Sequence, residues 1–220
     1  MNLVEITGVS KRFGSFQAVG GVSLSIAPGE VVGLLGANGA GKTTMMRMLC
    51  GLIKPDNGTI RINGRLGYMC QSFSLIEELT VKENIQFYGA LQGLSNATVS
   101  EREATITQAL KLGPYMSKRA TELPSGWRQA LSFSIAVIHN PSVLVLDEPT
   151  SGLDSISRRR LWNMIREKAA GGTAVIVSTH YLDEAFFCDR LAIMKEGRLI
   201  CEGPTGSIAS SRNALIDYFK

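Results

Sequence analysis

Hydrophobic and polar residues alternate along three short stretches in the N-terminal part of this chain, as they do in half-buried strands. The alternating stretches cover residues 3–7, 22–26 and 59–64, and a fully apolar run occupies residues 31–35. A Pro-Gly dipeptide separates the second alternating stretch from the apolar run, which indicates a turn. The pattern therefore predicts an antiparallel β patch in the N-terminal region.

The pattern changes to a helical one from about residue 83 to residue 136. Strand patterns then return at residues 143–146 and 174–177, and an amphipathic helix separates them. Strand, helix and strand in this order indicate a parallel sheet. Residues 191–194 and 198–201 flank a short polar turn, so we expect a β-hairpin near the end of the chain. The whole pattern predicts an α/β fold into which a helical segment is inserted.

Composition narrows the class of protein. The 220 residues, 45% of them hydrophobic, suit one domain or a core with one inserted subdomain. The net charge is only +4, and the basic run 158–160 is interpreted as a solvated helix face, so no nucleic acid is expected as a partner. Four scattered cysteines and two histidines do not form a zinc pattern, which favours a reduced, cytosolic protein. No apolar stretch approaches the roughly 20 residues of a membrane span, and no signal peptide is expected.

Residues 36–43 read Gly-Ala-Asn-Gly-Ala-Gly-Lys-Thr and match the G-x-x-x-x-G-K-[ST] loop that wraps the phosphates of a nucleoside triphosphate. The apolar run before the loop and the helical composition after it supply the strand, loop and helix that the motif requires. Glycines let backbone N–H groups close on phosphate oxygens, a lysine adds positive charge, and a threonine hydroxyl suits Mg²⁺. The expected nucleotide-binding residues of this loop are Gly36, Ala37, Asn38, Gly39, Ala40, Gly41, Lys42, Thr43 and Thr44.

A second candidate for chemistry is the apolar strand 143–146, which ends in Asp147 and Glu148. Parallel sheets place their ligands at the carboxyl ends of their strands, so both acids are expected near the bound nucleotide. Because successive strand residues point to opposite sides, we expect Asp147 to face Mg²⁺ and Glu148 to face the attacking water. This division of roles suits ATP hydrolysis.

Taken together, these motifs resemble the ATP-binding subunit of an ABC transporter over essentially the whole length of the chain. Beside the phosphate loop (Walker A) and the acidic strand (Walker B), residues 151–154 resemble the D-loop, and residues 178–180 match the switch histidine. Gln71 resembles the Q-loop glutamine, and Phe13 falls at the position of the aromatic residue that stacks on adenine.

The resemblance implies a P-loop NTPase fold with a RecA-like core, an N-terminal antiparallel β subdomain and an inserted helical subdomain. It divides the single domain 1–220 into an ATP-binding core, residues 1–72 and 137–220, and a helical signature subdomain, residues 73–136. By the same resemblance, His180 contacts the γ-phosphate, Asp154 links two subunits, and Gln71 joins Thr43 and, through water, Asp147 in positioning Mg²⁺.

One motif departs from the family pattern. The family signature reads Leu-Ser-Gly-Gly-Gln, whereas residues 123–127 read Leu-Pro-Ser-Gly-Trp. Pro124 suits the start of a helix, and Ser125 is expected to be the N-cap whose hydroxyl takes over the role of the missing serine. With Gly126 it would face the nucleotide of a second subunit, while Trp127 is expected to pack in the core. The sequence of this signature segment resembles that of ATPases of drug, polysaccharide or lipid exporters.

The implied function is ATP hydrolysis by two closing subunits that power a membrane exporter from the cytoplasmic face of the membrane, as peripheral proteins. The implied partners are an integral membrane subunit and a second ATPase subunit, identical or related. We expect the membrane subunit to dock on a groove lined by Phe73, Leu75 and Ile76. Two alternatives remain: a soluble ABC-type ATPase of DNA repair, chromosome maintenance or translation, or a degenerate site that binds ATP without hydrolysing it.

Overall fold

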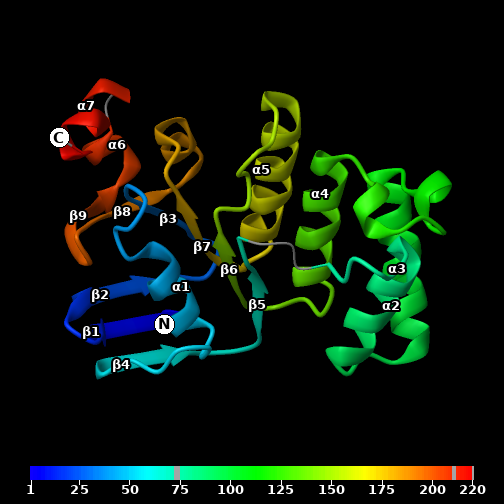
Figure 1. Ribbon diagram of the computed structural model, residues 1–220, viewed down its shortest axis with the longest axis horizontal. Helices are drawn as coiled ribbons and strands as arrows, with labels where there is room; N and C mark the ends of the chain where they lie inside the picture. The colour runs from blue at the N-terminus through cyan, green and yellow to red at the C-terminus, as the bar shows by residue number, and fades with distance from the viewer. Residues whose placement is uncertain (72–74, 210–211, 220) are drawn as a thin grey trace.

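The small sheet of this fold is antiparallel, as predicted. The computed structural model describes residues 1–71, 75–209 and 212–219 (Figure 1). Three strands pair in the order β2-β1-β4. Their bounds are β1 (Val4–Phe13), β2 (Phe16–Ile26) and β4 (Asn57–Ile62). Val4 pairs with Ile26, so the two predicted stretches 3–7 and 22–26 are the paired ends of a longer hairpin.

The large sheet holds six strands in the order β5-β6-β7-β3-β8-β9. All neighbouring pairs are parallel except β8 and β9, which confirms both the predicted parallel sheet and the predicted C-terminal hairpin. The strand β5 has only four residues, which is too short for an alternation to be recognised, and the sequence did not predict it. The strands are β3 (Val31–Leu35), β5 (Leu66–Met69), β6 (Val143–Asp147), β7 (Ala174–Thr179), β8 (Arg190–Lys195) and β9 (Arg198–Pro204).

Helices cover the predicted helical regions and two regions beyond them. The helix after the phosphate loop begins at residue 42, two residues earlier than predicted. The α-helices are α1 (Lys42–Leu49), α2 (Val81–Leu91), α3 (Asn96–Leu110), α4 (Ser125–Ala136), α5 (Ser155–Ala170), α6 (Thr205–Ile208) and α7 (Arg212–Ile216). The 3₁₀ turns are η1 (Gly113–Tyr115), η2 (Ala120–Glu122), η3 (Leu182–Phe187) and η4 (Asp217–Phe219).

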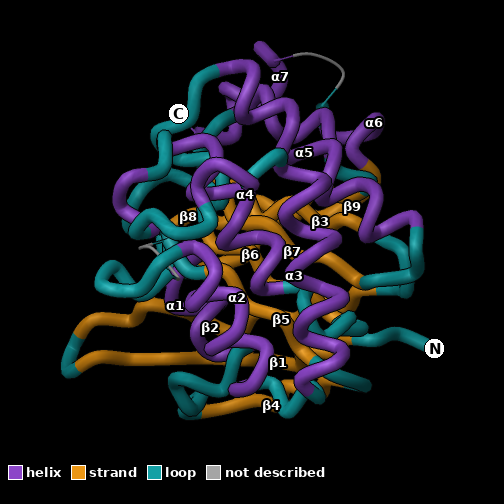
Figure 2. Tube along the Cα trace, turned by 90° about the vertical axis from the view of Figure 1, so that its right-hand side faces the viewer, coloured by secondary structure: helices purple, strands orange, loops and turns teal. Residues whose placement is uncertain are grey.

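Alternate residues of the large sheet belong to two different hydrophobic cores, because strand side chains point to opposite faces. On β6, Leu144 and Leu146 pack with Trp162 of α5, while Val143 and Val145 pack with Met45 of α1. Figure 2 shows α5 on one side of the large sheet and the antiparallel sheet on the other. The fully apolar strands predicted from the sequence are therefore buried on both faces.

The helices α2, α3 and α4 enclose a third core of their own, at the side of the molecule away from the antiparallel sheet (Figure 1). Its largest fully buried side chains are Ile85, Leu110, Leu112 and Leu131. Capping strengthens this unit, since Thr80 and Glu83 form a reciprocal capping box at the start of α2. The boundaries 73–136 for a separate subdomain remain a proposal.

The prediction of a docking groove for the membrane subunit is partly wrong. Leu75 packs inside the third core and is only 6% exposed, so it does not line an open groove. Ile76 is half-buried, and Phe73 lies outside the described residues. In the part of the chain that the structure describes, no helix combines the length and the apolar character needed to cross a membrane.

Two isoleucines of α5 allow a matched test of the core. Ile165 is fully buried between α5 and the sheet, whereas Ile156 on the same helix is 81% exposed. Ile165→Val should lower the free energy of unfolding by about 1 kcal/mol, because it removes one methylene from a packed site. Ile156→Val should change it by less than about 0.5 kcal/mol. Denaturant titration of both variants checks the difference, and equal effects would contradict the placement of α5.

Candidate functional site

The phosphate loop follows β3 and leads directly into α1, as its motif requires. Gly39 and Gly41 have φ angles of 82° and 99°, in the left-handed region that favours glycine. A Cβ atom on Gly41 would lie 2.3 Å from the carbonyl oxygen of Ala18. The loop therefore depends on glycine for its shape and for the access of phosphate to its backbone. It presents the free N–H groups of the helix start to an anion.

Lys42 is buried, with a side chain only 4% exposed. Its Nζ donates hydrogen bonds to the carbonyl oxygens of Gly36 at 2.8 Å and Ala37 at 3.1 Å. It also lies 3.5 Å from Oε1 of Glu148. A buried ammonium group needs such partners, and phosphate oxygens are an equivalent set of acceptors. The charge of Lys42 is thus held in place at the base of the loop.

Asp147 ends β6 with one carboxylate oxygen occupied and one unpartnered. Oδ1 accepts hydrogen bonds from Ser178 Oγ at 2.5 Å and from Thr43 Oγ1 at 3.4 Å. Oδ2 is buried and has no hydrogen-bond partner among the described residues. Burial raises the pKa of Asp147, and the bonds from Ser178 and Thr43 oppose that rise. An unpartnered carboxylate oxygen beside a threonine hydroxyl fits a hard divalent cation such as Mg²⁺.

The structure describes no group of three or more His, Cys, Asp or Glu side chains that would hold a metal ion without other ligands. A cation at Asp147 and Thr43 would therefore complete its shell with nucleotide phosphate oxygens and water, as Mg²⁺ does in nucleotide sites.

Glu148 lies just after the end of β6 and has a φ angle of 48°. We expected the alternation of strand side chains to separate Glu148 from Asp147. That reason is wrong, because Glu148 lies outside the strand and its own left-handed backbone sets the direction of its side chain. Its Oε2 lies 3.0 Å from His180 Nδ1 and accepts a hydrogen bond from Gln71 Nε2 at 3.3 Å. Gln71, Glu148 and His180 thus meet at one carboxylate, next to Lys42.

A cavity of about 330 Å³ opens beside these groups. It is lined by Phe16, Ala18, Asn38, Gly39, Gly41, Lys42, Thr43, Thr44, Gln71 and Glu148. Six of the nine predicted phosphate-loop residues and the predicted Q-loop glutamine thus share one cavity, which Gly36, Ala37 and Ala40 do not line.

The aromatic residue that lines the cavity is Phe16 and not Phe13. Both side chains are exposed, at 62% for Phe16 and 50% for Phe13. They are paired across the β1–β2 turn, and paired residues of antiparallel strands point to the same face. The sequence analysis missed Phe16, although the spelling Phe-Gly-Ser-Phe places an aromatic on each side of the turn.

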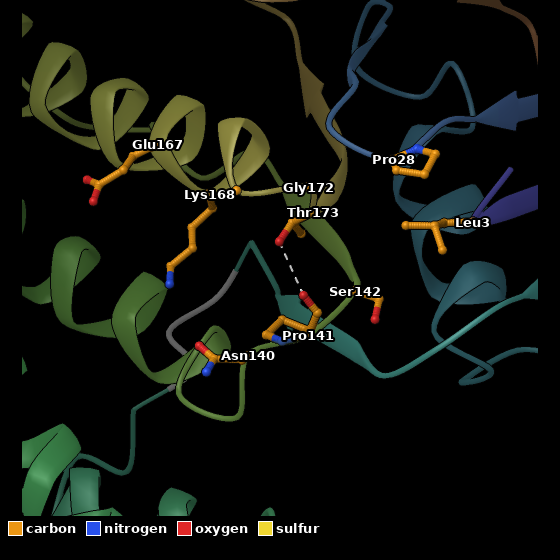
Figure 3. Close-up of a pocket in the computed structure, with 10 residues that line it drawn as sticks. Leu3, Pro28, Asn140, Pro141, Ser142, Glu167, Lys168, Gly172 and Thr173 are labelled. Carbon is orange, nitrogen blue, oxygen red and sulfur yellow. Dashed lines mark hydrogen bonds between the residues drawn. The ribbon is translucent and has the colours of Figure 1, made fainter. Parts of the chain in front are cut away.

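A second hollow, of about 490 Å³, lies at the opposite edge of the large sheet, near the amino ends of its strands (Figure 3). Asn140, Ser142 and Thr173 line it, together with Glu167 and Lys168 from the end of α5. Thr173 Oγ1 donates to the carbonyl oxygen of Pro141 at 3.2 Å across its floor. None of the sequence motifs reaches this hollow.

The signature segment forms the start of α4. The N-cap is Pro124, which makes no side-chain capping hydrogen bond, and Ser125 is the first helical residue, so the predicted N-cap is wrong. Pro124 takes this place because its φ of −53° and extended ψ suit the residue before a helix. Trp127 packs on Tyr115 with ring centroids 5.3 Å apart, which confirms its predicted use in packing.

Asp154 is the N-cap of α5. Its Oδ1 accepts hydrogen bonds from the backbone N–H groups of Ile156 and Ser157, and its Oδ2 accepts one from Ser157 Oγ at 2.6 Å. The hydrogen bonds from Ser157 lower the pKa of Asp154. Gly126 of the signature lies against this cap, because a Cβ there would be 2.3 Å from Ser157 Oγ. Ser125, Gly126 and Asp154 do not line the phosphate cavity of their own chain.

Three further residues, which no motif indicated, connect α4, α5 and η3 with the segments around the site. Gln129 of α4 is buried and donates from Nε2 to the carbonyl oxygen of Pro149 at 3.0 Å. Glu184 of η3 is fully buried and pairs with Arg158 of α5 at 3.4 Å. The prediction that the run 158–160 is only a solvated face is therefore wrong for Arg158. Its neighbours Arg159 and Arg160 are exposed.

Comparison with known proteins decides the family. Residues 19–151 match the family model described as "ABC transporter". The chain belongs to the ABC transporter family. The membership confirms the resemblance predicted from the motifs.

Relatives of this ABC transporter chain include ATP-binding proteins named for multidrug transport, Nod factor export or drug resistance. It is 38% identical to the probable multidrug ABC transporter ATP-binding protein YbhF of Escherichia coli, over 96% of its own length and 39% of that protein. It therefore spans only about two fifths of that relative. It is also 38% identical to the Nod factor export ATP-binding protein I of Paraburkholderia xenovorans, over 94% of this chain and 73% of that one. The daunorubicin/doxorubicin resistance ATP-binding protein DrrA of Streptomyces peucetius is 38% identical over 94% of this chain and 67% of the relative.

Solved structures of similar proteins agree with this family membership. A structure of the ATP-binding subunit of an ABC transporter is 28% identical, with a TM-score of 0.85 over 94% of this chain and 92% of that one. An ATP-binding cassette of another ABC transporter is 25% identical, with a TM-score of 0.88 over the whole of both chains. The ABC transporter chain therefore has the predicted α/β P-loop NTPase fold.

Proposed function

We propose that this ABC transporter family chain binds ATP with Mg²⁺, hydrolyses it, and thereby powers a membrane exporter. The observation that carries the proposal is the meeting of Lys42, Gln71 and Glu148 at one cavity, with Asp147 bonded to Thr43 and His180 lying 3.0 Å from Glu148. Export, rather than a role in DNA repair or translation, is supported by the names of the relatives in multidrug transport, Nod factor export and drug resistance.

ATP binding would replace contacts that the chain now makes with itself. Lys42 Nζ would exchange Glu148 for phosphate oxygens, while the backbone N–H groups of residues 39–44 close on the β- and γ-phosphates. Thr43, Asp147 and Gln71 would hold Mg²⁺, which neutralises charge on the phosphates when it is bound. The unpartnered Oδ2 of Asp147 supports this assignment.

Glu148 is assigned as the general base. Once Lys42 is taken up by phosphate, a Glu148 oxygen accepts a proton from water as the water oxygen bonds to the γ-phosphorus. The bond from the γ-phosphorus to the bridging oxygen breaks, leaving ADP and phosphate. His180, now 3.0 Å from Glu148, is placed to donate a hydrogen bond to the γ-phosphate. The presence of both side chains argues against a degenerate site.

A second ATPase subunit, identical or related, would complete the site. Ser125, Gly126 and Asp154 lie outside the phosphate cavity of their own chain, which supports their use toward the nucleotide of the other subunit. The helical segment 73–136 is proposed as the part that meets an integral membrane subunit, so that the chain works at the cytoplasmic face of the membrane as a peripheral protein.

Protein concentration tests the shared site. If each nucleotide is held between two subunits, the rate of ATP hydrolysis per subunit should rise with the concentration of the chain and then level off. The measurement is steady-state phosphate release over a range of protein concentrations with saturating Mg·ATP. A rate per subunit that stays constant at every concentration would contradict the two-subunit site.

The two aromatics of the β1–β2 turn give a second test. Since Phe16 lines the cavity, Phe16→Ala should weaken ATP binding about five- to ten-fold through loss of stacking on adenine. Phe13→Ala is the matched variant, on the same face of the same turn. Titration with a fluorescent ATP analogue measures both affinities. A larger loss for Phe13→Ala would return the adenine contact to Phe13, as the family resemblance implies.

A further inference from the structure

A buried carboxylate outside the motifs joins the two segments that carry the catalytic groups. Glu184 of η3 has no exposed surface. Its Oε1 accepts a hydrogen bond from Thr150 Oγ1 at 2.5 Å, and its Oε2 accepts one from Thr179 Oγ1 at 2.6 Å. Both threonines are themselves buried, each at 1% exposure. Each oxygen of one carboxylate thus holds a different stretch of chain.

The two stretches flank the groups assigned to catalysis. Thr150 lies two residues after Glu148, and its carbonyl oxygen accepts a hydrogen bond from Leu153 N, next to Asp154. Thr179 precedes His180, and its Oγ1 also accepts a hydrogen bond from Tyr181 N at 3.0 Å. Glu184 therefore binds the residue before the D-loop through one oxygen and the residue before the switch histidine through the other.

A third contact ties the carboxylate to the helix that Asp154 caps. Arg158 Nε lies 3.4 Å from Glu184 Oε1, and the Arg158 guanidinium carbon lies 4.3 Å from the ring centre of Tyr181. Arg158 supplies the positive charge that a buried carboxylate requires. Because it touches Tyr181 as well, it links the start of α5 to the residue after His180.

We propose that Glu184 is a positioning residue that makes the switch histidine and the D-loop move as one unit, an inference that rests on the proposed ATPase function. A carboxylate is planar and rigid, so a shift of Thr179 changes the position of the acceptor that holds Thr150. A change at His180 on loss of the γ-phosphate thereby reaches Asp154 inside the same chain. Glu184 itself touches none of the residues that line the phosphate cavity through a hydrogen bond or ion pair that the structure describes.

A double-mutant cycle tests the coupling in hydrolysis. Thr150→Val and Thr179→Val keep the shape of each side chain and remove its hydroxyl, while Thr150→Ser and Thr179→Ser keep the hydroxyl as matched controls. Each valine variant should lower kcat about ten-fold with ATP affinity within about two-fold of the parent, and the serine variants should recover most of kcat. The double valine variant should also have a kcat only about ten-fold below that of the parent, because the second change acts on a link that the first has already broken. A loss of about a hundred-fold, the product of two independent effects, would overturn the proposal.

Amide hydrogen exchange supplies a readout that does not need hydrolysis. In the chain without nucleotide, Glu184→Gln should speed exchange at Leu153 and at Tyr181 together, because one acceptor orders both segments. Faster exchange at one of the two segments alone would overturn the coupling. If the parent chain proves unable to hydrolyse ATP, the proposed function fails, yet the exchange experiment still decides whether Glu184 joins the two segments.

Discussion

Replacing Glu148 with glutamine should lower the rate of ATP hydrolysis about a thousand-fold while ATP binding survives. Glutamine keeps the size of the side chain and its hydrogen-bonding reach toward His180 and Gln71, which lie 3.0 Å and 3.3 Å from the carboxylate. It cannot accept a proton from water at neutral pH. It also removes the negative charge that occupies Lys42, so the affinity for ATP should stay equal or increase. The closed pair of subunits should then accumulate with ATP bound.

Two measurements check this expectation, namely phosphate release under single-turnover conditions and the mass of the particle with and without Mg·ATP. Glu77→Gln is the control, since Glu77 is exposed and carries the same change in charge. Glu148→Gln with more than about a tenth of the parent rate would remove Glu148 from the role of general base. If the parent and the variant form the same amount of ATP-dependent dimer, hydrolysis does not open the pair of subunits.

Lys42→Met should weaken the binding of ATP by about a hundred-fold or more and abolish hydrolysis at ordinary ATP concentrations. Methionine keeps the length of the buried stem, and it removes the ammonium group that now bonds to Gly36 and Ala37 and lies 3.5 Å from Glu148. The variant loses the charge that phosphate would meet, and Glu148 stays as a negative charge without its lysine partner, facing the same phosphates.

Titration calorimetry with ATP measures the loss of affinity, and circular dichroism shows whether the variant is folded. Lys54→Met, at an exposed position, is the control for the loss of one positive charge. A folded Lys42→Met variant that binds ATP like the parent would contradict the assignment of residues 36–43 as the phosphate loop.

The sequence predicted the parts of the fold that have a strong local signal. Long alternating or apolar runs gave the antiparallel patch, the parallel sheet and the final hairpin. The four-residue β5 and the helices α6 and α7 were not predicted, because each is too short for its periodicity to stand out.

For the site, motifs predicted which residues converge but not how each is held. The direction of Glu148 comes from one left-handed residue, which depends on the turn after β6 and not on strand alternation. The helix cap at Pro124 depends on local backbone angles, and the contact of Phe16 with the cavity depends on where the β1–β2 turn lies relative to the phosphate loop. Glu184 carries no motif at all, since its partners come from residues 150, 158 and 179 and meet only in the folded chain.

In the proposed pair of subunits, the helix cap at Asp154 limits what this residue can offer to the partner. A carboxylate offers about four lone pairs, and three of these accept hydrogen bonds from Ile156 and Ser157. A neighbouring subunit therefore finds room for one donor, and a second donor would have to unwind the first turn of α5. In the proposed pair, direct protein contact through this residue is therefore weak, and the shared nucleotide would supply more of the adhesion. Such a pair would come apart once its nucleotide is spent, and the two subunits would be free to begin another round.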